Sequence, residues 1–254
     1  MPIPSLVICE LLGVPYADRD DFQRRSNQLV DVSRPREELM RAMRESDLYM
    51  ADLVARAKAG PGDDMLGMLV REHAGELSDA ELKGVCGLLL VAGHETTANM
   101  LGLGTLAMLR HPEQLALLRE EEEPERVDAA VEELLRWLTV ANSSAIRVTT
   151  TDVELSGRRI PAGEVVMCSL AAANRDPELL ADADRFDITR DRIGHIGFGH
   201  GPHHCLGAPL ARMELRIALP ALLKRFPGLR EAEPEPRFNA THLVYGLSSL
   251  QVAW

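Results

Sequence analysis

The chain contains 254 residues, of which 46% are hydrophobic and 26% charged, as is usual for a globular protein that buries a core. Asp and Glu (39) outnumber Lys and Arg (28), and the formal net charge of -11 argues against general binding of nucleic acid or anionic membranes. The four cysteines form no Cys-x-x-Cys pair, which disfavours a disulfide framework and indicates a reducing, cytoplasmic location. Because we find no repeat, linker or clear boundary, we expect residues 1–254 to form a single domain.

No targeting segment and no membrane span are expected from the sequence. Residues 1–10 have neither the basic region nor the small-residue cleavage site of a signal peptide. The most apolar stretch, Val85 to Gly93, is too short to cross a bilayer. We therefore expect neither a membrane nor a nucleic acid among the partners of this protein.

The first half of the chain is predicted to be helical. Apolar residues at helical spacing predict a surface helix over 36–59. Ser78 and Glu81 have the spacing of a capping box, and the helix that they begin is expected to run to Arg110. Because this long helix is apolar on most sides around 85–91, we expect it to be central and buried.

The second half mixes helices with short strands. Further helices are expected from Pro112 onward, over 127–138 and over 206–226. Alternating, β-branched residues bounded by turn signals predict strands over 147–155, 165–170 and 241–254. The predicted fold class is therefore mainly α with small antiparallel β-sheet elements.

A polar insertion, residues 94–97 (His-Glu-Thr-Thr), interrupts the apolar central helix. Buried polar groups cost free energy unless they are paired, so the insertion needs a reason. A metalloprotease zinc motif would require His at the fifth position, where Ala98 stands, and that motif therefore fails. The insertion either satisfies its own polar groups within a kinked helix or serves a site.

The segment 198–207, Phe-Gly-His-Gly-Pro-His-His-Cys-Leu-Gly, carries the strongest chemical signal. Its glycines let the backbone turn tightly and approach a flat ligand closely. Cys205 lies at the start of a predicted helix, where free N–H groups and the helix dipole favour a thiolate that can bind a metal. His200 and His203 beside Cys205 also permit a zinc site, although no second ligand cluster with zinc-finger spacing exists.

Residues 198–212 resemble the haem-binding loop of the cytochromes P450, the haem-thiolate monooxygenases, in their soluble bacterial form. Other segments agree with this family in order and spacing. They are the oxygen-activation motif at 92–97, the Glu-x-x-Arg signature at 133–136 and the meander at 174–177 and 184–186. The resemblance implies the cytochrome P450 fold, of which this chain would be the C-terminal portion, because whole family members are considerably longer.

By this resemblance Cys205 is the proximal thiolate ligand of the iron in haem b (iron protoporphyrin IX), where it favours cleavage of the O–O bond. His203 and Arg147 match positions that bind the haem propionates. A local helix distortion near Ala92 would make room for dioxygen. The residues implied to contact the cofactor, besides Cys205, are Phe198, Gly199, His203, Gly207, Arg147 and Ala92.

The resemblance also implies roles away from the iron ligand. Glu95 and Thr96 match the acid–alcohol pair that relays protons to the bound oxygen. Glu133 and Arg136 match a buried structural pair, and Arg185 is the best match for the meander arginine that completes their network.

Segments 90–93, 140–146 and 243–247 match regions that usually line the substrate pocket. They are small and apolar with a few hydroxyl groups, which indicates a lipophilic small organic substrate of medium size.

The function implied is insertion of one oxygen atom of O2 into such a substrate, with electrons from NAD(P)H delivered by a ferredoxin and its reductase. The alternative is a catalytically incompetent haem-binding remnant, because the N-terminal portion of the family is missing. A zinc-binding protein that uses His200, His203 and Cys205 is a third possibility.

Overall fold

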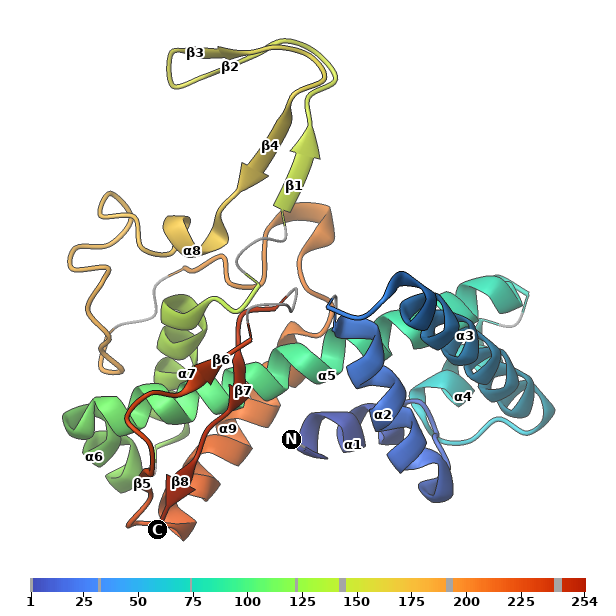
Figure 1. Cartoon of the computed structure of the whole chain (residues 1–254), viewed down its shortest axis with the longest axis horizontal. Helices are drawn as coiled ribbons and strands as arrows, with labels where there is room; N and C mark the ends of the chain where they lie inside the picture. The colour runs from blue at the N-terminus through green and yellow to red at the C-terminus, as the bar shows by residue number, and fades with distance from the viewer. Residues whose placement is uncertain are drawn as a thin grey trace. The chain divides into compact units, whose positions relative to one another are not determined.

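The computed structural model describes residues 2–31, 33–73, 75–121, 123–141, 145–190, 194–239 and 244–254 (Figure 1). Helices dominate these residues, and the strands among them form two-stranded antiparallel sheets, which confirms the predicted fold class. The chain forms two compact units, Met1–Asn99 with Asn239–Leu243 and Met100–Phe238 with Val244–Trp254. Whether they behave as one domain stays a prediction.

The first unit is helical. It contains α1 (Pro2–Leu11), the 3-10 helix η1 (Tyr16–Asp18), α2 (Arg19–Val30), α3 (Arg36–Ala59), α4 (Met65–Glu72) and residues 79–99 of α5 (Asp79–Arg110). The capping box predicted for α5 is present, since Ser78 N donates to Glu81 Oε2 (2.8 Å) and Glu81 N donates to Ser78 Oγ (3.3 Å). The core is built from side chains of all the α-helices, among them Ile8, Phe22, Met50, Leu66 and Leu90.

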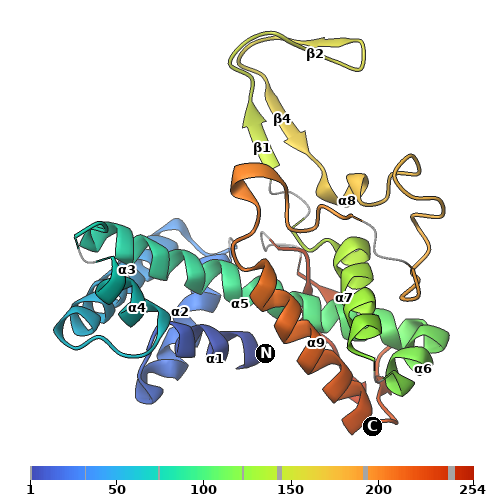
Figure 2. The same cartoon turned by 180° about the vertical axis from the view of Figure 1, so that it is seen from behind.

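The second unit packs helices around a leucine-rich core. It holds the rest of α5, α6 (Pro112–Glu120), α7 (Pro124–Leu138), α8 (Leu170–Ala173), the 3-10 helix η2 (Gly201–His203) and α9 (Ala208–Arg225). Helix α9 packs against α6 and α7 (Figure 2). Fully buried residues such as Met108, Leu134 and Leu215 come from α5, α7 and α9. This packing fixes the helix that follows Cys205 against the helix that carries Glu133.

The strands are shorter and more numerous than predicted, with β3 (Arg158–Ile160), β5 (Arg230–Glu231) and β6 (Arg237–Phe238) outside the predicted ranges. The strand predicted over 147–155 is two strands, β1 (Ala145–Val148) and β2 (Val153–Leu155), which pair with β4 (Val165–Cys168) and β3 respectively. The chain leaves β1 because Thr149 Oγ1 donates to the Pro161 carbonyl (2.6 Å), which fixes a bend that local alternation does not reveal.

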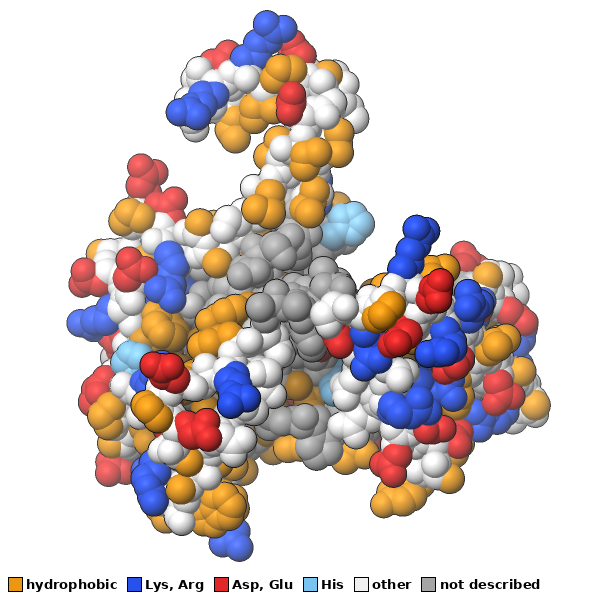
Figure 3. Space-filling model, in the orientation of Figure 1, with side chains coloured by type: hydrophobic (Ala, Val, Ile, Leu, Met, Phe, Trp, Pro, Cys, Tyr) orange, Lys and Arg blue, Asp and Glu red, His pale blue; other side chains and the backbone are white. Residues whose placement is uncertain are grey.

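The predicted C-terminal strand is also divided. It contains β7 (Leu247–Ser249) and β8 (Val252–Ala253), which pair with β6 and β5 respectively. The β1–β4 ribbon exposes apolar side chains (Figure 3), namely Ile146, Val148, Val165 and Met167.

Across the part of the chain that the structure describes, we find no helix that combines the length and the apolar character needed to cross a membrane.

Candidate functional site

The loop that carries Cys205 is folded tightly on itself. Cys205 N donates to the Phe198 carbonyl (2.9 Å), and Gly199 N donates to the Ile196 carbonyl (2.8 Å). Gly199 (φ +74°) and Gly201 (φ +78°) lie in the left-handed region, which residues with a side chain rarely adopt. The glycine pattern thus closes the loop so that Cys205 is presented directly before α9.

The surroundings of Cys205 fit a flat metal centre. Its side chain is exposed, and a Cβ at Gly207 would lie 3.9 Å from its sulfur, so the glycine leaves that side of the sulfur open. A haem iron brings four ring nitrogens of its own and needs a single strong ligand from the protein, which a thiolate at a helix start supplies. The residues present therefore fit a haem.

The zinc site that the sequence allowed finds no support. Among the described residues, which include His200, His203 and Cys205, no three His, Cys, Asp or Glu side chains are gathered so that they could hold a metal ion. His203 is exposed in η2, and Arg147 is exposed in β1, where its Nη1 donates to the neighbouring Ile146 carbonyl (2.9 Å). The contact of these two residues with propionates stays a prediction.

Phe198 is packed among charged and aromatic side chains. The guanidinium of Arg212, on α9, lies over the Phe198 ring at 4.6 Å from its centroid. The rings of His195 and His204 lie 6.0 and 6.3 Å from the same centroid. The ring therefore connects the start of the Cys205 loop to the helix that follows it.

A buried asparagine, which the sequence analysis left without a role, ties the loop to the helices. Asn174 is 0% exposed, its Nδ2 donates to Thr139 Oγ1 (2.8 Å), and its Oδ1 accepts from Ile196 N (2.9 Å). Its carbonyl also accepts from Arg136 Nη1 (2.8 Å). Asn174 thus joins the end of α7, the meander and the residue two positions before Phe198.

The Glu133–Arg136 pair is buried in α7. Arg136 donates from Nε to Glu133 Oε2 (2.7 Å) and from Nη2 to Glu133 Oε1 (2.8 Å), and the two side chains are 2% and 4% exposed. Arg136 Nη1 also donates to the Ala183 carbonyl (2.8 Å), while Asp187 N donates to Glu133 Oε1 (3.0 Å). The pair therefore fixes the meander to α7, which is a structural task.

The third arginine of this network differs from the prediction. Arg185 takes part through its main-chain carbonyl, which accepts from Arg136 Nη2 (3.3 Å), while its own side chain is largely exposed and pairs with Asp187. The guanidinium near Glu133 belongs to Arg190, whose Nε lies 3.5 Å from Glu133 Oε1. Arg185 and Arg190 lie close together in a segment rich in turns. The hydrogen bonds of this segment decide which guanidinium faces Glu133, and sequence periodicity does not reveal them.

The predicted oxygen-activation motif lies in the first unit. Thr96 Oγ1 donates to the Ala92 carbonyl one turn earlier (2.6 Å), and Glu95 is 8% exposed. Residues 79–110 form one α-helix, α5, and the Thr96 hydroxyl adds its bond within this helix, while the distortion expected near Ala92 stays a prediction. A Cβ at Gly93 would lie 2.5 Å from Ile8 Cδ1, so this glycine allows a close approach of α1.

His94, the neighbour of Glu95, has a structural partner. Ser26 Oγ donates to the Leu90 carbonyl (3.4 Å) and lies at hydrogen-bond distance from His94 Nδ1 (2.7 Å), which joins α2 to α5. Burial lowers the pKa of His94. The imidazole is therefore neutral, and it holds the first part of α5 in place.

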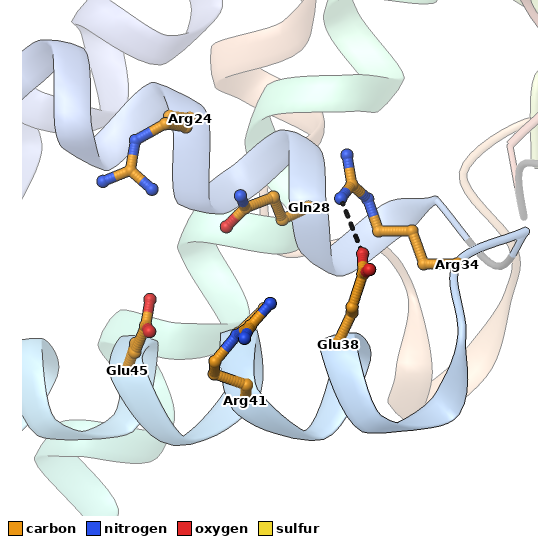
Figure 4. Close-up of a pocket in the computed structure, with 7 residues that line it drawn as sticks. Arg24, Gln28, Arg34, Glu38, Arg41 and Glu45 are labelled. Atoms are coloured by element: carbon orange, nitrogen blue, oxygen red, sulfur yellow. Dashed lines mark hydrogen bonds and ion pairs between the residues drawn. The ribbon is translucent and has the colours of Figure 1, made fainter.

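The segments predicted to contact substrate are described only in part. Residues 142–144, which include Ser143 and Ser144, and Leu243 lie outside the described residues. A cavity of about 200 Å³ between α2 and α3 (Figure 4) contains none of the predicted site residues. Its polar lining is Arg24, Gln28, Arg34, Glu38, Arg41 and Glu45.

The chain is similar to members of one known protein family. The profile of the family described as Cytochrome P450 matches residues 36–252. Cytochrome P450 FAS1 of Rhodococcoides fascians is 49% identical over 100% of this chain, and the chain spans 63% of that relative. Vitamin D(3) 25-hydroxylase of Pseudonocardia autotrophica is 47% identical over 98% of this chain and 62% of its own length. Both relatives are therefore considerably longer than the chain.

A solved structure has a similar fold. The LnmA cytochrome P450 hydroxylase from the leinamycin biosynthetic pathway of Streptomyces atroolivaceus is 46% identical, with a TM-score of 0.91 over 100% of this chain and 66% of its own. The family profile, the identities and the shared fold together show that this chain belongs to the cytochrome P450 family.

Proposed function

We propose that this chain is the haem-ligating part of a haem-thiolate monooxygenase that inserts one oxygen atom of O2 into a lipophilic small organic substrate. The observation that carries the proposal is the Cys205 loop, which presents one open sulfur at the start of α9. The word hydroxylase in the names of two similar proteins supports the reaction class. Electrons would come from NAD(P)H through a ferredoxin-type donor, and the cytoplasmic location stays a prediction.

The residues that would hold haem b come from the Cys205 loop and from β1. Cys205 would ligate the iron, Phe198 would cover the sulfur side, and Gly199 and Gly207 would leave room for the ring. The cofactor, when bound, supplies the redox chemistry that activates dioxygen. His203 and Arg147 are exposed, and each would offer a donor to a propionate.

The chain's own acid–base groups would deliver protons. Thr96 would pass a proton at Oγ1, which now donates to the Ala92 carbonyl, and Glu95 would hold one at its carboxyl group. A hydroxyl and a carboxyl on adjacent residues of one helix suit proton transfer, because rotation of the two side chains is sufficient and the helix backbone need not move. His94 keeps the helix in register through Ser26.

A spectrum of the purified, haem-loaded chain tests the proposal. The reduced protein treated with carbon monoxide should show the strongly red-shifted band of a thiolate-ligated haem. Cys205→Ala should abolish this band, whereas Cys168→Ala should keep it, since Cys168 is also exposed but lies in β4. A haem spectrum without this band, or stoichiometric zinc without haem, would contradict the proposal. A thiolate band without any turnover would favour the catalytically incompetent remnant.

A further inference from the structure

Glu132, the neighbour of the buried Glu133, is directed toward the Cys205 loop. Its two carboxylate oxygens accept from Arg212 Nε (2.6 Å) and Nη2 (2.8 Å), and Oε2 also lies 3.0 Å from His195 Nε2. The Glu132 side chain is 18% exposed. Two consecutive glutamates of α7 thus have different tasks, since Glu133 fixes the meander and Glu132 contacts residues on both sides of Cys205.

The first connection runs through His195 to the beginning of the loop. Gly197 N donates to His195 Nδ1 (3.0 Å), so Nδ1 is an acceptor and the hydrogen on Nε2 is directed to Glu132. A Cβ at Gly197 would lie 2.9 Å from the Leu135 carbonyl, which shows how closely the backbone approaches α7 here. The position of Gly197, directly before Phe198, therefore depends on the orientation of the His195 ring.

The second connection runs through Arg212 to the aromatic residue of the loop. Its guanidinium is held edge-on by Glu132 and lies over the Phe198 ring at 4.6 Å, a favourable cation–π geometry. The carbonyl of Phe198 in turn accepts from Cys205 N (2.9 Å). Glu132 is therefore linked, through the Arg212 guanidinium, to Phe198, the residue whose carbonyl accepts from the Cys205 amide.

The charges of this cluster are complementary. Burial opposes ionisation of Glu132, but the hydrogen bonds from Arg212 and His195 outweigh it and lower the pKa of Glu132 to about 2. The pKa of Arg212 is raised by its hydrogen bond to Glu132 and, in smaller part, by the nearby sulfur of Cys205. An ionised Glu132 and a cationic Arg212 are therefore present together at neutral pH.

We propose that Glu132 is a positioning residue for the iron-ligand loop: it holds His195 and Arg212, and through them it fixes Gly197, Phe198 and the backbone of Cys205. A carboxylate is needed because it accepts from three N–H donors at once, which a carboxamide cannot do. The link to haem ligation rests on the proposed function, whereas the positioning of the loop does not.

The chain contains a matched control. Asp128 lies one turn before Glu132 on α7, and Arg216 lies one turn after Arg212 on α9, with Asp128 Oδ1 2.5 Å from Arg216 Nε. This pair joins the same two helices with the same charges. Asp128→Asn therefore removes a similar charge pair between the same two helices.

Hydrogen exchange of the purified full chain tests the positioning itself. In Glu132→Gln, the amides of residues 197–205 should exchange about tenfold faster, the size expected when one charge-assisted hydrogen bond is lost. Asp128→Asn should leave their rates within about twofold of the parent chain. Equal rates in the parent chain and Glu132→Gln, or equal acceleration by Asp128→Asn, would overturn the proposal.

A second measurement links the loop to the iron and separates this inference from the proposed function. In haem-loaded protein, the thiolate-type carbon monoxide band should be lost about tenfold faster in Glu132→Gln than in Asp128→Asn. Absence of the band from the parent chain would contradict the proposed function while leaving the exchange experiment valid. A stable band in Glu132→Gln would overturn the proposal.

Arg212→Lys serves where Glu132→Gln does not fold. Lysine keeps the charge but has neither the planar fork for Glu132 nor the flat face for Phe198. We expect an intermediate acceleration of exchange, confined to residues 197–205. Glu132→Asp should restore part of the protection because it keeps the acceptor charge, and a failure of both variants to alter the loop would contradict the role of Glu132.

Discussion

Glu133 and Arg136 lie three residues apart on α7 and form a two-pronged ion pair whose side chains are almost completely buried. Arg136 also donates to the main-chain carbonyls of Asn174 and Ala183, so its removal takes the guanidinium partner from a buried carboxylate and this donor from both carbonyls. We expect Arg136→Ala to lower the free energy of unfolding by about 3–5 kcal/mol. Urea denaturation followed by circular dichroism measures this change.

An exposed pair at the start of the same helix provides the comparison. Arg126 Nε lies 3.4 Å from Glu123 Oε2, and both side chains are mostly exposed. Arg126→Ala should change the free energy of unfolding by about 0–1 kcal/mol. A similar cost for the two substitutions would mean that the buried network contributes no more than an ordinary surface pair.

Asn174 should be important for both stability and local order. In Asn174→Ala the amide of Ile196 loses its acceptor and Thr139 Oγ1 loses its donor, at about 1–3 kcal/mol for each buried group left unsatisfied. Exchange of the Ile196 amide should accelerate together with the loss in unfolding free energy. Asn27→Ala, at an exposed position of α2, should change stability by less than about 0.5 kcal/mol, and an equal effect of the two variants would contradict the role of Asn174.

Local sequence signals were sufficient for the helices and the loop. The Ser78–Glu81 capping box is formed as predicted because both partners lie within one turn. The Cys205 loop was recognisable because the backbone angles at Gly199 and Gly201 favour glycine, and such angles are also local. Periodicity and caps therefore predicted the bounds of α3 and α5, whereas α7 begins three residues earlier than predicted, at Pro124.

Contacts between distant segments were not predictable in the same way. Glu132 reads as a solvated helix charge, yet it binds His195 and Arg212, which lie 63 and 80 residues further along the chain. Likewise, nothing local distinguishes Arg185 from Arg190, since the folded meander decides which guanidinium reaches Glu133. One usable signal was the pair of adjacent glutamates in α7, because a helix buried on one face seldom carries two acids there without partners.

Thr96→Ala tests the proton relay. In the haem-loaded chain with an electron donor and a substrate, we expect the ratio of product formed to electrons consumed to fall, because the Oγ1 that passes the proton is lost. Thr96→Ser keeps the hydroxyl and should retain most of the coupling. Thr96 Oγ1 donates to the Ala92 carbonyl, which lies within α5, so loss of the hydroxyl should change the free energy of unfolding little. Unchanged coupling in Thr96→Ala would reject the relay.

Glu214, on α9, makes stability depend on pH in an unusual direction. It is 7% exposed, its Oε2 has no hydrogen-bond partner among the described residues, and burial raises its pKa from 4.5 to about 7. A raised pKa means that the folded protein binds a proton that the unfolded chain releases. Its contribution to stability is therefore present below pH 4.5 and is lost as the pH rises toward 7, by about 3 kcal/mol in all.

Glu214→Gln removes this dependence without changing the size of the side chain. The variant should be more stable than the parent chain at pH 8, by up to about 3 kcal/mol, and close to it at pH 4.5. Urea denaturation at several pH values measures the difference, with Glu113→Gln, in α6, as a control for loss of one charge. A constant difference across this range would show that Glu214 is ionised in the folded protein and that a partner or water compensates its burial.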